Sequence, residues 1–62
     1  MKRDADLHIK YEILRPRLNE RAFRLCLAAD AKAYGYGGVI RVALASGVSR
    51  TTIHAGLKEL AE

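Results

Sequence analysis

The sequence predicts an all-α protein, a small bundle of about four helices that ends in a helix-turn-helix. Apolar residues recur at helical spacing along the chain, and no stretch shows the sustained alternation of a half-buried strand. Glycine, proline and helix-capping residues separate the helical segments. With 62 residues, the chain is long enough for one small domain only. We therefore predict a single domain, residues 1–62, with two supporting helices in 1–35 and a loop plus helix-turn-helix in 36–62.

The first helix is expected over residues 4–14, where Leu7 and Tyr11 recur at helical spacing and an aspartate suits the helix start. Ile9 and Ile13 form a second apolar line, so we expect this helix to be covered on two sides. A proline follows shortly afterwards and ends the helix, because the residue before proline avoids the α conformation.

A second helix is expected over residues 20–34, with Asn19 as its N-cap and Gly35 in the left-handed conformation at its end. Its apolar face consists of Ala22, Phe23, Leu25, Cys26, Leu27, Ala29 and Ala33. The arginines on the more polar side, which we interpret as solvated rather than as phosphate contacts, are Arg17, Arg21 and Arg24. We expect Cys26 to be buried and inert.

The glycine-rich loop that follows, GYGG at 35–38, interrupts the helical pattern. It lacks the Lys-Ser/Thr of a phosphate-binding P-loop, and no strand precedes it, so we interpret it as a connection. Tyr34 and Tyr36 could stack on bases, but we expect both to pack over helix ends.

Two short helices are expected to complete the chain, over residues 39–45 and 50–60. A tight turn joins them, in which Gly47 accepts a positive φ without a Cβ clash. Ser49 is placed to cap the last helix.

The spacing of small and apolar residues around this turn is typical of a DNA-reading helix-turn-helix. Ala43 is the small residue expected where the two helices cross, and Val48 is expected to fill the gap beneath the turn. Ile53 and Leu57, one helical turn apart, are expected to bury the last helix against the one before it. An αα-hairpin with a glycine turn has similar spacing, but the last helix also begins with Ser, Arg, Thr and Thr on its outward side.

The charge distribution favours a polyanionic partner. The chain carries a net charge of +4, and residues 31–58 contain four cations and no Asp or Glu. We therefore predict binding to double-stranded DNA. The predicted DNA-binding residues are Ser49, Arg50, Thr51, Thr52, His54, Lys58 and Arg41.

Each of these residues has an expected role. Arg50 is the best candidate for reading a base, because a guanidinium can bind O6 and N7 of guanine together. Thr51 can contact a thymine methyl group or a phosphate, and His54 an acceptor or a phosphate. Ser49 and Thr52 are expected at phosphates beside the groove, and Arg41 and Lys58 are expected to neutralise the backbone; Ala55 shares their exposed side.

From about residue 11 to residue 62, the chain resembles the N-terminal region of bacterial insertion-sequence transposases of the Rhodopirellula transposase type. The matching segments are LNER (18–21), AADAKA (28–33), GYGG (35–38), GVSRTTI (47–53) and GLKEL (56–60). The resemblance implies a module that recognises the terminal DNA of the mobile element. It also implies a separate DDE-type catalytic domain, with carboxylates and divalent metal in an RNase H-like fold. That domain does not fit in 62 residues, so we carry over no catalytic residue and expect a fragment of a longer transposase.

Several functional classes are disfavoured by the sequence. A single cysteine excludes an intramolecular disulfide, and the two histidines lack zinc-ligand spacing. No apolar run is long enough to cross a membrane, and no signal-peptide core follows Met1. We expect a cytoplasmic protein that is not an enzyme and has no catalytic residue, metal site, cofactor or small-molecule substrate.

Two alternatives remain open at this stage. One is a helical module for protein interaction or dimerisation, with its basic charge incidental; a homodimer would also stabilise so small a core. The other is a stand-alone repressor or antitoxin that uses the same helix-turn-helix. The target sequence, the oligomeric state and the affinity do not follow from the sequence.

Overall fold

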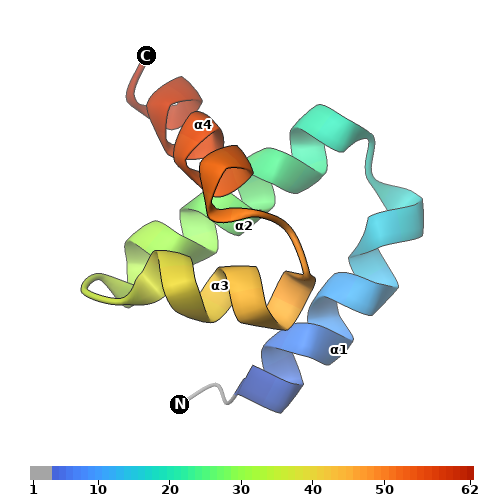
Figure 1. Cartoon of the computed structure of the whole chain (residues 1–62). Helices are drawn as coiled ribbons and strands as arrows, with labels where there is room; N and C mark the ends of the chain where they lie inside the picture. The colour runs from blue at the N-terminus through green and yellow to red at the C-terminus, as the bar shows by residue number, and fades with distance from the viewer. Residues whose placement is uncertain (1–3) are drawn as a thin grey trace.

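The computed structural model describes the backbone of residues 4–62 and the side chains from residue 5 onward. Within these residues the chain is all helical, as predicted (Figure 1). The elements are α1 (Asp4–Leu14), the 3-10 turn η1 (Arg15–Arg17), α2 (Glu20–Tyr34), α3 (Gly38–Ser46) and α4 (Arg50–Ala61). The predicted helices agree with these bounds to within one residue at each end. No helix in this part of the chain has the length and apolar character needed to cross a membrane.

The helix ends follow the capping residues in the sequence. Oδ1 of Asn19 accepts a hydrogen bond from the N–H of Ala22 at 2.7 Å, and this caps α2. Gly47 ends α3 in the left-handed conformation at φ 76° and ψ 6°, as predicted. Gly35 also has a positive φ of 80°, but its ψ of −132° lies outside the left-handed helical region. The left-handed residue in this loop is instead Gly37, at φ 79° and ψ 1°.

The core lies between α2 and the other helices, which pack around it. Its largest fully buried side chains are Tyr11, Leu7, Leu27, Ile53 and Val42. The rings of Tyr11 and Phe23 meet edge to face, with their centroids 6.0 Å apart. The Tyr11 hydroxyl donates a hydrogen bond to Asp30 at 2.7 Å, and Lys10 pairs with the same carboxylate at 2.9 Å. These contacts fix α1 to α2.

Only one side of α1 is covered. Ile9 and Ile13 are 54% and 53% exposed, so the expectation that this helix is covered on two sides is wrong for the described chain. Tyr36 at the tip of the glycine loop is fully exposed, also against expectation, whereas Tyr34 packs against the core as predicted. Cys26 is only half-buried, and this burial raises the pKa of its thiol.

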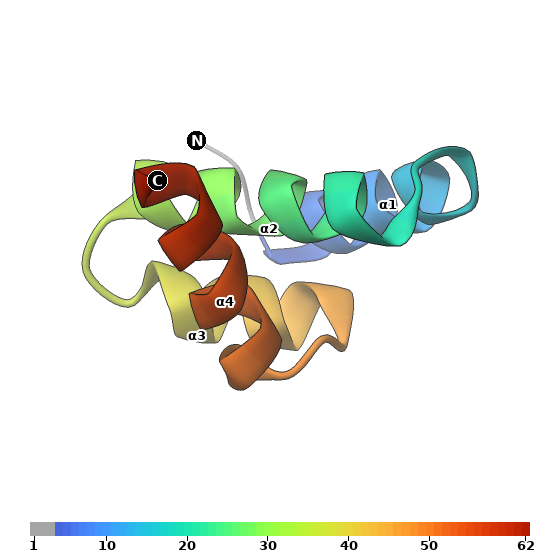
Figure 2. The same ribbon diagram turned by 90° about the horizontal axis from the view of Figure 1, so that it is seen from above.

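The closest helix contacts are made at glycines. A Cβ at Gly38 would overlap the carbonyl oxygen of Ala31, where α3 begins beside α2. A Cβ at Gly56 would lie 2.9 Å from the carbonyl oxygen of Arg24 and 3.0 Å from Cβ of Ala28. Sequence analysis assigned the close crossing to Ala43. The structure shows that α4 crosses chiefly over α2 and makes the smaller contact with α3 (Figure 2).

Candidate nucleic-acid interface

A short hydrogen-bonded turn sets the direction of α4. The N–H of Gly47 donates to the carbonyl of Ala43 at 2.9 Å, and the N–H of Val48 donates to Oγ of Ser46 at 3.1 Å. Oγ of Ser49 then accepts from the N–H of Thr52 at 3.2 Å, which confirms Ser49 as the N-cap of α4. Val48 is half-buried against the core, as the pattern predicted. The polar backbone of this exposed turn is therefore well satisfied.

Arg15 ties this turn to the first half of the chain. Its Nη2 donates a hydrogen bond to the carbonyl of Ser46 at 2.6 Å, 31 residues further on. Its guanidinium also lies over the ring of Phe23, 4.7 Å from the centroid. Sequence reasoning missed this role, because nothing in the local pattern around Arg15 indicates so distant a partner.

The outward face of α4 carries the predicted residues. Arg50, Thr51, His54 and Lys58 are exposed, as is Ser49 at the cap, and Ala55 lies on the same open side. Opposite them, Ile53 is fully buried and Gly56 faces α2. The predicted exposure of these side chains is thus confirmed. Arg50, His54 and Lys58 follow one another at intervals of four residues, so they form a basic line along the helix.

The carboxylate that α4 carries in its last turn points away from this face. Glu59 accepts hydrogen bonds from Nε of Arg24 at 2.7 Å and from Nε of Arg21 at 3.1 Å. These bonds, that from Arg24 above all, lower the pKa of Glu59. Arg24 is only 23% exposed, so its interpretation as a solvated side chain is wrong. Residues 50–58 thus present cations with no carboxylate among them.

The other predicted residues lie apart from this line. Thr52 is half-buried, with its hydroxyl 3.0 Å from Oγ of Ser49, and it lines a cleft on the α2 side together with Arg15 and Arg24. Arg41 is on α3, with its guanidinium over the ring of Tyr34, 5.3 Å from the centroid. The structure therefore places five of the seven candidates on the exposed side of α4 and at its N-cap, with Thr52 turned toward α2 and Arg41 on α3.

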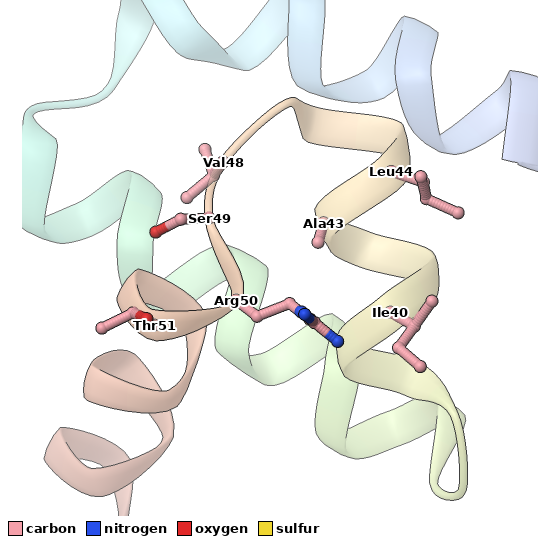
Figure 3. A pocket seen from close by; sticks show the side chains of 7 residues that line it. All are labelled: Ile40, Ala43, Leu44, Val48, Ser49, Arg50 and Thr51. Atoms are coloured by element: carbon pink, nitrogen blue, oxygen red, sulfur yellow. The ribbon is translucent and has the colours of Figure 1, made fainter.

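A shallow groove lies between α3 and the start of α4, with a volume of about 570 Å³ (Figure 3). Its lining residues are Ile40, Ala43, Leu44, Val48, Ser49, Arg50 and Thr51. The Arg50 side chain extends from α4 toward α3 in this view. Ile40 and Leu44 are 52% and 76% exposed, so the α3 side of the groove presents aliphatic surface to water. Sequence analysis did not single them out, although their spacing of four places them on one helix face.

Among the residues that the structure describes, no cluster of three or more His, Cys, Asp or Glu side chains could hold a metal ion. Comparison of the chain with known protein families, with curated proteins and with solved structures finds no match. The site therefore has to be interpreted from its own geometry and charge.

Proposed function

We propose that the chain is a DNA-binding helix-turn-helix module that places the beginning of α4 in the major groove. The observation that carries this proposal is the acid-free outward face of α4, which combines Arg50, His54 and Lys58 with a capped and well-braced N-terminus. The positive end of the helix dipole lies at the same place and favours an approaching phosphate. A basic face that only contacts water would not need a capped and hydrogen-bonded turn in front of it.

In this proposal Arg50 reads a guanine through O6 and N7, while Thr51 and His54 contact neighbouring base edges or phosphates. The hydroxyls of Ser49 and Thr52 lie within hydrogen-bond distance of each other at the cap. In this proposal they contact phosphates at the edge of the major groove. Lys58 lies two helical turns further along and Arg41 on α3, and both neutralise the backbone. The chain is not an enzyme in this proposal and needs no cofactor.

The resemblance to insertion-sequence transposases suggests which DNA is read. We propose that the module recognises the ends of a mobile element and that catalysis belongs to a separate domain. The test is to select bound duplexes from a random pool and to search the DNA around the gene. Finding the selected site as an inverted pair that flanks the gene would support this assignment. A single site upstream of the gene would favour a stand-alone repressor or antitoxin.

DNA binding itself is tested by fluorescence anisotropy with a labelled random duplex across a series of salt concentrations. Each phosphate that a cation neutralises releases counterions, so the logarithm of the association constant should fall linearly with the logarithm of the salt concentration. An unchanged anisotropy at every salt concentration would contradict the proposal.

A second candidate function is favoured by the outer face of α1. Ile9 and Ile13 are half exposed and lie one helical turn apart, as residues of a dimer or partner interface would. Sedimentation of the chain over a range of concentrations distinguishes the two functions. The interaction function would replace the DNA proposal if the chain forms a dimer that Ile13→Lys abolishes and if it binds no DNA in the anisotropy assay.

A further inference from the structure

The groove between α3 and the start of α4 combines an aliphatic wall with a basic one. One wall, from α3, is aliphatic, and its Ile40 and Leu44 leave much of their surface in water. The other wall is the start of α4, with Arg50 and Thr51. Covering water-exposed aliphatic groups with an apolar partner is favourable, because it removes their surface from water.

The charge around the groove restricts that partner. Residues 31–58 contain no carboxylate; Arg41 lies between the two aliphatic residues in the chain, and Arg50 follows them. A polyanion is therefore attracted to this surface, whereas an apolar protein segment would have to approach a basic rim. The aliphatic pair is also far smaller than the roughly 800 Å² that each partner of a stable protein interface contributes.

Unmodified duplex DNA is a polyanion that offers one apolar group in its major groove, the C5-methyl group of thymine. Successive bases on one strand are about 3.4 Å apart along the axis. A guanidinium bound to a guanine therefore lies within about one base step of the bases on either side of that guanine. In Figure 3 the Arg50 side chain extends from α4 toward α3, and it lines the same groove as the two aliphatic side chains.

We propose that this groove is a methyl-reading subsite, in which Ile40 and Leu44 contact the C5-methyl group of a thymine adjacent to the guanine that Arg50 holds. This inference rests on the proposed function and deepens it, because it assigns thymine as the preferred neighbour of that guanine. It also gives the methyl contact, which sequence analysis offered for Thr51 as an alternative to a phosphate, to the aliphatic wall of α3.

The test begins with selection of bound duplexes from a random pool by the full chain, in which a thymine next to a guanine should be enriched. The thymine is then replaced by deoxyuridine, which differs only by the methyl group. Burial of one such group is worth about a fourfold change in affinity, so wild-type binding should weaken by about that factor. Leu44→Ala and Ile40→Ala should bind both duplexes with nearly equal affinity.

The matched control is Ile13→Ala. Ile13 is as exposed as Ile40, at 53% against 52%, but it lies on α1 outside the groove. This variant should keep the fourfold preference for thymine. All three substitutions replace exposed side chains, so each variant should fold, and circular dichroism checks this.

The remaining outcomes separate this inference from the proposed function. Salt-dependent binding with equal affinity for thymine and deoxyuridine would overturn the methyl subsite and leave DNA binding intact. A thymine preference that survives both Leu44→Ala and Ile40→Ala would place the methyl contact elsewhere and overturn the assignment. Absence of DNA binding at any salt concentration would overturn both.

Discussion

The carboxylate of Glu59 in α4 accepts a hydrogen bond of 2.7 Å from Nε of Arg24 in α2, 35 residues earlier in the chain. The same carboxylate also binds Arg21, so one acidic side chain holds the outer half of α4 against α2. The orientation of α4 relative to α2 therefore depends on an ion pair as well as on buried side chains.

Replacing this carboxylate should produce a pH-dependent loss of stability. The pKa of Glu59 is lowered in the folded state from its ordinary value of 4.5, so its contribution is complete above that value and is lost as the pH falls through the lowered pKa. Glu59→Gln should therefore lower the Tm at neutral pH, and the difference from wild type should close in strong acid. Thermal unfolding followed by circular dichroism at several pH values measures this. Glu62→Gln, at an exposed terminal residue, is the control and should leave the Tm unchanged.

Gly56→Ala should destabilise the fold, although alanine is the better helix former by about 1 kcal/mol. The added Cβ would lie 2.9 Å from a backbone oxygen of Arg24, which cannot move as a flexible side chain can. Overpacking of this kind costs about 1–3 kcal/mol, so the free energy of unfolding in urea should fall. Because helix propensity alone predicts the opposite sign, a stabilised variant would show that α4 does not approach α2 this closely.

Arg15→Lys tests the brace on the turn without changing the charge. Lysine has no planar guanidinium, so the hydrogen bond to the Ser46 carbonyl and the stacking on the Phe23 ring are lost. We therefore expect the free energy of unfolding to fall by about 1 kcal/mol. Arg17→Lys is matched to it, because Arg17 also donates to a backbone carbonyl, that of Ile13, but at an exposed site within its own segment. Its effect should stay within about 0.5 kcal/mol. Equal losses in the two variants would remove the special role of Arg15.

These long-range contacts mark the limit of what the sequence predicts. The bounds of the helices and the cap at Ser49 follow from local patterns, because helical periodicity and capping act within a few residues. The partner of Glu59 and the close approach at Gly56 depend on how α4 crosses α2, which no local pattern encodes. Ile9 has the spacing of a buried residue and yet is exposed, because spacing does not show which of two apolar lines faces the core.

The exposed face of α4 was predictable, since Ile53 had to point inward if a helix-turn-helix formed at all. The aliphatic wall of α3 was not. Ile40 and Leu44 have the composition of core residues, and only the packing of α3 on α2 and α1 turns them outward.

Arg50→Ala should weaken binding to a selected DNA site by about 1–3 kcal/mol and relax the base preference at one position. Arg50→Lys is the matched variant, because it keeps the charge but loses the bidentate geometry. It should therefore lose base preference while its salt dependence stays unchanged. Competition anisotropy with selected and random duplexes measures both. An equal loss on the two kinds of DNA would show that Arg50 contacts the backbone only.

Lys58→Ala should reduce affinity for all sequences alike and lower the slope of log affinity against log salt by about one. Lys58→Arg keeps the charge and should preserve the slope. A change in base preference without a change in slope would mean that Lys58 reads a base, contrary to the role proposed for it.

Among residues 5–62, the acidic side chains lie in α1, in α2 and at the C-terminal end of the chain (Glu59 and Glu62), whereas every charged side chain of α3 and of the first nine residues of α4 is basic. The carboxylates that would repel a polyanion are therefore absent from α3 and the start of α4, whereas α1 and α2 carry both signs of charge. Within the distance set by ionic strength, a polyanion meets less repulsion when the α3–α4 side approaches it. A larger share of collisions would therefore begin with that side leading, before any contact forms.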